Sequence, residues 1–487
     1  MIEKLKELSK DTVIYGISTI LGRFLGFLLV PFYTNIFPTA EYGIYTYLYT
    51  IIAFLNVVYI YGMDAAYMKY ASLSENEGKK NVFSTPLIFL TVTSFLISSV
   101  ILIFRDPVIH FLNVPERYSF LLYYILGILV LDTLALIPFA SLRLERKAVK
   151  FATIKIINII INLSLNILLI LYYKMGIEAI FISNIIASGF SLIALLPEIK
   201  EKMKITLQTG ILKRMIKFGI PYLPASMAAI MVQMIDVPIL RELTNDSTVG
   251  VYRANYKLGI FMLLFVSMFQ YAWQPFFLNN AKEKNAKEIF SKVLTLFVLV
   301  ASIIWIVVSL FIDNLAAIEF FNGKSLIGKS YLSGIYIVPL ILFAYIFHGM
   351  YVNFQAGIYI EEKTKYFPYI TGTGALLNVA TNFLLIPVWG MFGAAMATFV
   401  SYFAMAIFIY FVSQKFYKIK YEFNRVIPNL ILISAILVVY YYLYFEGFLT
   451  FGVKILMLVS FLVLAFALGI LRKKEILRAF LIIQSKR

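Results

Sequence analysis

The chain has 487 residues, of which 61% are hydrophobic and only 14% are charged, and its mean hydropathy is +0.86. This composition excludes an ordinary soluble globular protein, in which apolar and charged residues are closer to balance. Cysteine is absent and the only histidines are His110 and His348, so we expect no disulfide, no metal and no cofactor. The net charge of +17 does not indicate nucleic-acid binding, because the basic residues lie between apolar runs rather than on a soluble face.

Apolar runs of about 20 residues, long enough for a helix to cross about 30 Å of hydrocarbon, recur along the whole chain. They predict an all-α integral membrane protein with about fourteen transmembrane helices. The charged stretch Met1 to Lys10 precedes a long first run without a small-residue cleavage site, so this run is expected to stay as a helix. The predicted helices are centred near Gly22, Leu55, Thr93, Leu129, Leu163, Ile186, Ala229, Leu264, Val300, Ala344, Leu377, Val400, Ser434 and Phe461.

The lysines and arginines give the helices a predicted orientation. If the N-terminus is cytoplasmic, 33 of the 43 basic residues fall in cytoplasmic segments and 6 in outer loops. By the positive-inside rule, this asymmetry predicts a multi-pass protein of the cytoplasmic (inner) membrane with both termini cytoplasmic. The remaining four basic residues lie within predicted spans: Arg23, Arg253, Lys257 and Lys454.

A parallel internal repeat appears when the chain is compared with itself at an offset of 207 residues. Matching pairs include Val30-Pro31 with Val237-Pro238, Gly43 with Gly250, Tyr45 with Tyr252, and Phe83-Ser84 with Phe290-Ser291. Later the offset becomes 216, where Asn162 and Asn166 match Asn378 and Asn382. A repeat of six helices keeps both copies in one orientation, as in two-lobed transporters that bind cargo between the lobes.

The repeat predicts four regions. Residues 1–200 form an N-terminal six-helix lobe and residues 201–425 a C-terminal six-helix lobe, around a central cavity. Residues 426–471 add two transmembrane helices, and residues 472–487 form a cytoplasmic amphipathic tail on the anionic inner leaflet, or else a merely solvated tail.

Charged residues inside the predicted spans are the candidate site, because an ionisable group in hydrocarbon needs a partner or a wet cavity. Arg23 lies near the middle of the first helix, about 18 Å from Asp11. It either pairs with Asp64 or Asp132 within one lobe or faces a phosphate group in a cavity. Asp64 and Asp132 are also candidates for holding and relaying a proton.

Arg253 and Lys257 lie four residues apart in the eighth helix and therefore share one face. Two like charges on one face favour a site for an anion, although Arg253 could also extend to the outer headgroups. Asp236, just before Pro238, either pairs with one of these cations or binds a coupling H⁺ or Na⁺.

Other polar residues in the spans favour structural roles. The asparagines Asn158, Asn162, Asn166, Asn378 and Asn382 are spaced by four along helix faces, which is typical of interhelical hydrogen bonding, with sugar binding as the alternative. A lone histidine such as His348 is more often hydrogen-bonded within a bundle. Signatures of soluble enzymes, such as a P-loop, are missing, so the sequence does not predict an enzyme.

Several segments resemble the polysaccharide flippases (Wzx-type) of the multidrug/oligosaccharidyl-lipid/polysaccharide exporter superfamily. They are Gly22 to Phe27, Glu41 to Tyr45, Val249 to Tyr252 leading to Lys257, and Asn378 to Asn382 followed by Leu385-Ile386-Pro387 and Gly390 to Thr398. The resemblance covers nearly the whole chain, but in the N-terminal copy of the last motif Glu178 stands where a small residue is usual.

The resemblance implies a flippase that carries a polyprenyl-diphosphate-linked oligosaccharide from the inner to the outer leaflet by alternating access. Arg23 and Lys257, with Arg253, would bind the diphosphate. The implied partners are membrane lipids, H⁺ or Na⁺, and a glycan polymerase complex. Two alternatives are a multidrug/cation antiporter of the same superfamily, which the basic residues disfavour, and a membrane glycan polymerase or ligase, which the repeat and the short outer loops disfavour.

Overall fold

The computed structural model describes residues 22, 24, 26–74, 76–319 and 323–471. Within this part the chain is helical and forms no β-strand, with a single β-bridge between Glu319 and Ser325. Twelve of its helical stretches are long and apolar enough to cross a membrane, and they match the second to the thirteenth predicted helices. The fourteenth is the shorter helix Phe451–Ala467. The prediction of a multi-pass, all-α membrane protein is therefore confirmed for the described residues.

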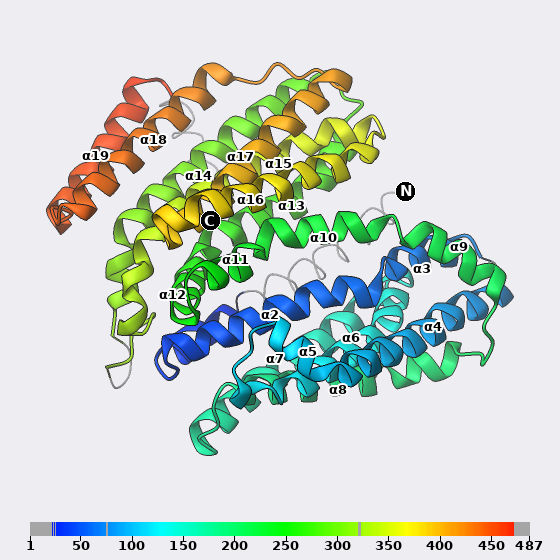
Figure 1. Cartoon of the computed structure of the whole chain (residues 1–487). Coiled ribbons are helices and arrows are strands. Elements are labelled where there is room, and N and C mark those ends of the chain that lie inside the picture. Colours follow the sequence, from blue (N-terminus) through cyan, green and yellow to red (C-terminus); the bar gives the residue numbers. More distant parts are fainter. Residues whose placement is uncertain (1–21, 23, 25, 75, 320–322, 472–487) are drawn as a thin grey trace. The chain divides into compact units, whose positions relative to one another are not determined.

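The chain divides into two compact units by its internal contacts. Unit 1 comprises residues 1–241 and 245–250, and unit 2 comprises residues 242–244 and 251–487. Within each unit the long helices lie side by side (Figure 1). This division follows contacts, not sequence repetition, so the boundary of the repeat near residue 200 stays a prediction.

The helices of unit 1 begin after the part of the first helix that ends at residue 34. They are α2 (Thr39–Ile60), α3 (Met63–Ser72), α4 (Asn76–Ile103), α5 (Arg105–Phe111), α6 (Leu121–Leu144), α7 (Ala148–Ile167), α8 (Glu178–Lys202), α9 (Thr209–Gly219), α10 (Tyr222–Met234) and α11 (Asp236–Leu243). Helix α6 is central, because α2, α3, α4, α7 and α8 all pack on it.

The helices of unit 2 begin with α12, whose first turn belongs to unit 1. They are α12 (Asp246–Tyr256), η3 (Lys257–Gly259), α13 (Ile260–Asn280), α14 (Ala286–Ala317), α15 (Val338–Ile360), α16 (Phe367–Trp389), α17 (Met391–Phe416), α18 (Phe423–Phe445) and α19 (Phe451–Ala467). Helix α15 is the most deeply buried and packs on α13, α14 and α17.

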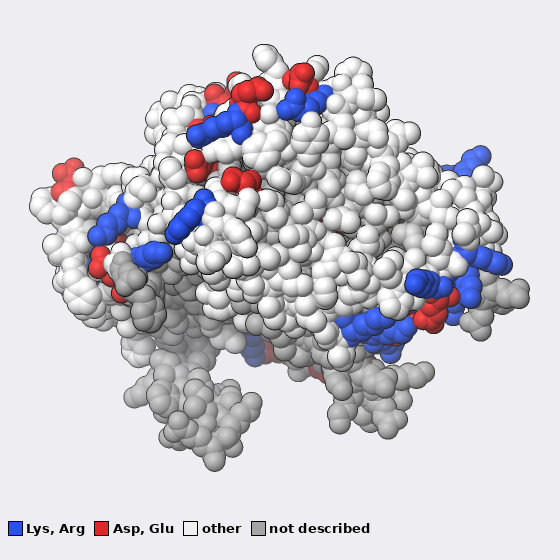
Figure 2. Space-filling view, turned by 90° about the horizontal axis from the view of Figure 1, so that it is seen from below, with Lys and Arg blue, Asp and Glu red and all other residues white. Residues whose placement is uncertain are grey.

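The surface agrees with a membrane environment. Large apolar side chains are exposed along many helices, for example Phe95, Leu376 and Val438. In the view of Figure 2, charged residues gather in a few groups and leave wide uncharged areas between them. Exposed apolar surface of this extent would be costly in water, whereas in a bilayer it contacts lipid.

The segment that follows α8 is bound to the rest of unit 1. The backbone N–H of Lys204 donates to Ser84 Oγ at 2.7 Å, and Thr206 Oγ1 donates to Asn81 at 3.1 Å. In α9, Met215 is fully buried against α3, α4 and α6. The Lys69 ammonium lies 4.1 Å from the centre of the Phe218 ring. Helix α9 is therefore part of unit 1 and not a loose tether.

Hydrogen bonds hold the last helix, α19, to α14 at one end and to α18 at the other. Lys454 on α19 is buried, and its Nζ donates to Asp313 at 2.7 Å and to Asn314 at 2.7 Å. At the other end, Arg425 Nη2 donates to the carbonyl of Ile470 at 2.7 Å. The intramembrane lysine that the charge count left unassigned is thus an anchor for the last helix.

A cluster of charges ties the α6–α7 loop to α8. The carboxylate of Glu198 is 1% exposed and accepts bonds from Lys150 at 3.0 Å, from Lys147 at 3.4 Å and from Lys202. Glu145 also pairs with Lys147, at 2.8 Å, and with Lys202. We call these five residues the Glu198 cluster.

The Glu198 cluster should make the stability of unit 1 depend on pH at the acid end. Partial burial raises the pKa of Glu145, but the hydrogen bonds from Lys147 and Lys202 outweigh it and bring the pKa below its usual 4.5. A depressed pKa gives stability that is present above pH 4.5 and is lost as pH falls through the folded-state value. The melting temperature of the protein should therefore fall as pH is lowered below 4.5, and less steeply for Glu145→Gln. The melting temperature of Glu201→Gln, a change at an exposed position, should fall with pH as that of the parent does. If the melting temperature of Glu145→Gln followed the same pH dependence as the parent, the prediction would be wrong.

Candidate functional site

Arg23, the first predicted phosphate ligand, lies outside the described residues, so its role stays a prediction. The described part of the same helix runs beside α7. A Cβ atom on Gly22 would lie 3.3 Å from Ile159 Cδ1, and the Tyr33 hydroxyl donates to Asn166 at 2.8 Å. Where it is described, at residues 22, 24 and 26–34, the first helix therefore contacts both apolar and polar residues of α7.

Arg253 and Lys257 lie where α12 passes into the 3-10 turn η3. Arg253 is buried at 8% exposure, and its guanidinium lies 4.9 Å from the centre of the Tyr256 ring. Lys257 is half-buried and interacts electrostatically with Arg253, as expected for two cations on one helix face. Unit 2 thus brings the two predicted cations together within one span, and the more accessible one is Lys257.

Asp236 is the first residue of α11, and only Ile235 separates it from the end of α10. Its side chain is 2% exposed, and its Oδ1 accepts the backbone N–H of Val237 at 3.0 Å. The break just before Pro238 is the one expected from proline within a helix. The pairing of Asp236 with Arg253 or Lys257, and its binding of an ion, stay predictions.

Asp132 on α6 belongs to a chain of hydrogen bonds inside unit 1. The Ser188 hydroxyl donates to Asp132 Oδ1 at 2.7 Å and lies 3.4 Å from Asn184 Oδ1. Asn184 Nδ2 in turn donates to the Tyr49 hydroxyl at 2.8 Å. The chain connects α2, α6 and α8, so Asp132 is held by structural partners whether or not it also relays a proton.

Lys155 is a charged residue of this region that belongs to the 33 basic residues counted as cytoplasmic from the sequence. It lies in α7, its Nζ is 4.2 Å from the centre of the Phe139 ring, and its charge interacts with Asp132. A signal was present in the sequence, because Lys155 precedes Asn158 by three residues and so continues the asparagine face of α7.

Asp64 is the second residue of α3. The helix follows Tyr61 and Gly62, whose positive φ angles of 31° and 73° separate it from α2. A carboxylate there is favoured by the partial positive charge of a helix N-terminus. The helix N-terminus is a structural reason for an aspartate at this position. The role of Asp64 in proton transfer stays a prediction.

The asparagines act between and along helices. Asn158 Nδ2 donates to the Ala187 carbonyl at 2.7 Å and to Ser191 at 2.9 Å, which joins α7 to α8. Asn382 Nδ2 donates to Asn378 Oδ1 at 2.7 Å, within α16. For Asn158, the geometry favours interhelical hydrogen bonding over sugar binding.

Two further observations concern ligands. His348 packs among tyrosines, with its ring centre 4.7 Å from that of Tyr402. Among the described residues, no group of three or more histidine, aspartate or glutamate side chains is arranged to hold a metal ion.

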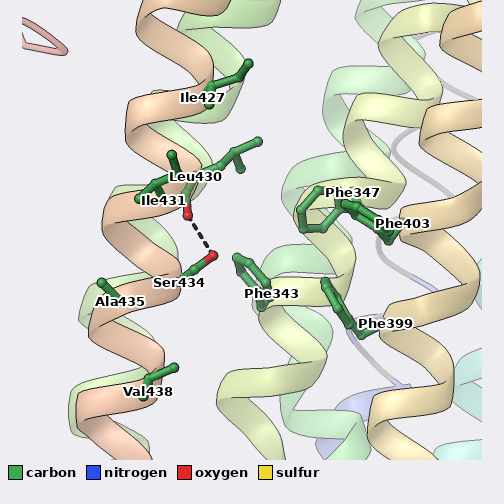
Figure 3. Close-up of a pocket in the computed structure, with 10 residues that line it drawn as sticks. All are labelled: Phe343, Phe347, Phe399, Phe403, Ile427, Leu430, Ile431, Ser434, Ala435 and Val438. Atoms are coloured by element: carbon green, nitrogen blue, oxygen red, sulfur yellow. Dashed lines mark hydrogen bonds between the residues drawn. The ribbon is translucent and has the colours of Figure 1, made fainter.

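An apolar groove of about 450 Å³ lies on unit 2 between α18 and the helices α15 and α17 (Figure 3). Its lining consists of Phe343, Phe347, Phe399, Phe403, Ile427, Leu430, Ile431, Ser434, Ala435 and Val438. The one polar side chain, Ser434, donates its hydroxyl to the Leu430 carbonyl of its own helix at 2.7 Å. The groove therefore presents mostly hydrocarbon and aromatic surface. The sequence could not show it, because α18 is apolar around most of its circumference and the groove depends on how α18 packs on α14.

A model of a family described as "Polysaccharide biosynthesis protein" matches residues 36–325, which is more than half of the chain. The chain belongs to this polysaccharide biosynthesis family. An uncharacterized membrane protein of Methanocaldococcus jannaschii is 21% identical over 445 residues, covering 83% of the chain and 85% of that protein. The segment matched by the family model, residues 36–325, includes Asp64, Asp132, Asp236, Arg253 and Lys257 but not Arg23.

Two solved structures place this member of the polysaccharide biosynthesis family in a fold. The lipid II flippase MurJ, in an inward closed conformation, is similar with a TM-score of 0.73 at 16% identity, over 93% of this chain and 98% of that one. An inward-facing multidrug resistance MATE family transporter of the MOP superfamily has a TM-score of 0.67 at 11% identity, over 81% and 94%. These similarities confirm the fold that the resemblance implied.

Proposed function

We propose that the protein is a flippase that moves a polyprenyl-diphosphate-linked oligosaccharide from the cytoplasmic to the outer leaflet by alternating access. The observation that carries the proposal is the groove between α18 and α15/α17, in a member of a polysaccharide biosynthesis family. A groove lined almost entirely by apolar side chains favours a hydrocarbon chain, and a polyprenyl carrier supplies one.

The charged end of the same cargo needs a different partner. A diphosphate cannot cross hydrocarbon unaccompanied, and cations inside the span lower that barrier through charge-assisted hydrogen bonds. Arg23, Arg253 and Lys257 are the residues we assign to it, with Lys257 the most accessible of those described. Asp236, Asp64 and Asp132 are assigned to coupling by H⁺ or Na⁺.

The proposal includes the arrangement of the chain in the membrane. Both termini lie on the cytoplasmic side of the inner membrane, and residues 1–200 and 201–425 form two lobes around a central cavity. Residues 426–471 form the two additional helices, of which α18 lines the groove. A glycan polymerase complex would use the delivered oligosaccharide on the outer side.

The test is translocation of a fluorescent polyprenyl-diphosphate oligosaccharide in vesicles that contain the purified protein, read with a membrane-impermeant quencher. Ala435→Trp, which fills the groove, should lower the rate about tenfold by excluding the carrier chain. Val439→Trp is the matched control, since Val439 is exposed on the same helix but does not line the groove. It should transport at the parent rate.

The outcomes also separate the alternative functions. Transport of a soluble organic cation, with no translocation of the lipid-linked cargo, would favour a multidrug antiporter. Extension of glycan chains by the purified protein without translocation would favour a polymerase. Equal rates for Ala435→Trp and the parent would remove the groove from the proposal.

A further inference from the structure

A second apolar cavity, of about 220 Å³, lies within unit 1, apart from the groove on unit 2. Its walls come from four helices: α2 contributes Leu48 and Leu55, α4 contributes Ile101, α5 contributes Val108, and α6 contributes Ile125. Only two of the lining residues carry a polar side-chain group. An apolar cavity of about 150 Å³ already stays dry and binds benzene-sized molecules, so this cavity favours hydrocarbon over water. We call it the α5 cavity.

The short helix α5 is held in place at both ends, so the α5 cavity is formed before any ligand binds. At its start, Arg105 Nη2 donates to the hydroxyl of Ser119, a lining residue, at 2.9 Å. After its end, the Arg241 guanidinium donates to the carbonyl groups of Leu112 and Asn113, each at 2.8 Å. A preformed wall lowers the entropy that binding would otherwise cost.

The α5 cavity adjoins surface that contacts lipid. Ile103 and Phe104, which directly precede α5, are 76% and 57% exposed. Phe111, which lines the cavity, is 86% exposed. Apolar surface of this extent contacts hydrocarbon in a bilayer. The bilayer itself therefore supplies hydrocarbon chains beside the cavity.

The rim of the α5 cavity carries charges of both signs. Arg105 Nη1 donates to Asp106 Oδ1 at 2.9 Å, and the Asp106 side chain is 85% exposed. The Arg105 Nε is buried and has no hydrogen-bond partner among the described residues. Arg117 lies 4.5 Å from the ring centre of Tyr118, the other polar lining residue, and 3.7 Å from the Glu41 carboxylate. Each arginine of the rim thus has a carboxylate beside it.

A rim of this kind suits a zwitterionic headgroup better than a purely anionic one. Arginine binds phosphate through charge-assisted hydrogen bonds, and a neighbouring carboxylate binds an ammonium group in the same way. An exposed ion pair such as Arg105–Asp106 contributes little by itself, so both members can exchange each other for a ligand at small cost.

We propose that the α5 cavity binds an acyl chain of a phospholipid whose headgroup has a phosphate and a primary ammonium, as phosphatidylethanolamine does. Arg105 bonds the phosphate and Asp106 bonds the ammonium, while the chain lies against Val108 and Ile125. Binding at this site requires no translocation of cargo. The proposed orientation of the chain places the site in the outer leaflet.

The first experiment measures lipid affinity by native mass spectrometry of the purified, delipidated protein in detergent. Phosphatidylethanolamine is titrated, and the affinity of the first bound lipid is compared between variants. Arg105→Gln, which loses the charged bond to phosphate, should bind about tenfold more weakly. Lys174→Gln, at an exposed position in the loop before α8, removes one cation elsewhere on unit 1 and should bind as the parent does.

The second experiment tests the headgroup. Phosphatidylglycerol has the phosphate but no ammonium, so the parent should bind it about tenfold more weakly than phosphatidylethanolamine. Asp106→Asn changes an exposed side chain and should fold as the parent does. It should bind both lipids with equal affinity. A preference for phosphatidylethanolamine that persists in Asp106→Asn, or that is missing in the parent, would overturn the assignment of the headgroup.

The third experiment tests the cavity. Val108→Trp fills it and should lower the affinity for phosphatidylethanolamine at least about tenfold. Ile103→Trp is the matched control, because Ile103 is exposed nearby and does not line the cavity. Equal affinity of Val108→Trp and the parent would overturn the site.

Two further outcomes separate the site from the transport of cargo. Displacement of bound phosphatidylethanolamine by an equal concentration of polyprenyl phosphate would assign the cavity to the carrier chain and overturn the proposal. Binding with the expected dependence on Arg105, Asp106 and Val108, in a protein that moves no lipid-linked cargo, would keep the site and overturn the proposed function.

Discussion

Glu198→Ala is expected to lower the free energy of unfolding by about 3 kcal/mol, the low end of the cost of breaking a buried ion pair by removing one partner. The carboxylate is 1% exposed and is shared by Lys147, Lys150 and Lys202. Without it, three ammonium groups remain close together with Glu145 as their only carboxylate within the cluster. The figure stays at the low end because Lys147 and Lys150 are 39% and 40% exposed and can turn toward water.

The measurement is thermal unfolding of the purified protein in detergent, by circular dichroism and by intrinsic fluorescence. Glu198→Gln should be nearly as damaging, because it keeps the shape but loses the charge. Glu201→Ala, at an exposed position of the same helix, should change stability by no more than about 0.5 kcal/mol. Equal stability of Glu198→Ala and Glu201→Ala would show that the cluster contributes nothing net.

The positions of the spanning helices could be predicted because the bilayer fixes how long an apolar run must be, and run length is local in sequence. The break between α10 and α11 at Ile235 could also be predicted, because a proline such as Pro238 disfavours a continuous helix whatever surrounds it. The repeat rests on matches between residues of restricted use, such as Gly43 and Gly250, and stays a prediction.

The sequence could not predict which faces of the helices pack against one another. Glu198 sits among charged residues at the end of a predicted helix, and only the packing of the α6–α7 loop against α8 buries it. Lys155 was counted with its loop neighbours because a linear charge count ignores the direction of a side chain. The groove beside α18 and the α5 cavity likewise depend on helix packing, which apolar composition does not encode.

The cations Arg253 and Lys257 show both what the sequence could predict and what it could not. Their presence within spans was readable from the sequence, and the structure adds that Arg253 is buried against Tyr256 while Lys257 is more accessible. That difference gives the two residues unequal expected roles. Arg253 contributes to packing as well as to charge, whereas Lys257 is better placed to meet a ligand.

Lys257→Gln is therefore expected to lower the translocation rate of a polyprenyl-diphosphate oligosaccharide about ten- to a hundredfold. A hydrogen bond between charged groups contributes about 1.5–3 kcal/mol, and about 1.4 kcal/mol corresponds to a factor of ten in rate. The assay is the vesicle measurement with a membrane-impermeant quencher. Lys257→Arg keeps the charge and should retain most of the rate, and Lys324→Gln, in an exposed loop, should behave as the parent.

Arg253→Gln provides the contrast that identifies the binding cation. Because Arg253 is 8% exposed and stacked on Tyr256, its replacement should lower both the melting temperature and the rate. Lys257→Gln should lower the rate with a smaller change in melting temperature, since the lysine is more exposed than Arg253. A well-folded Lys257→Gln protein with the parent rate would remove Lys257 from the site, and the diphosphate would then have to be met by other cations such as Arg23.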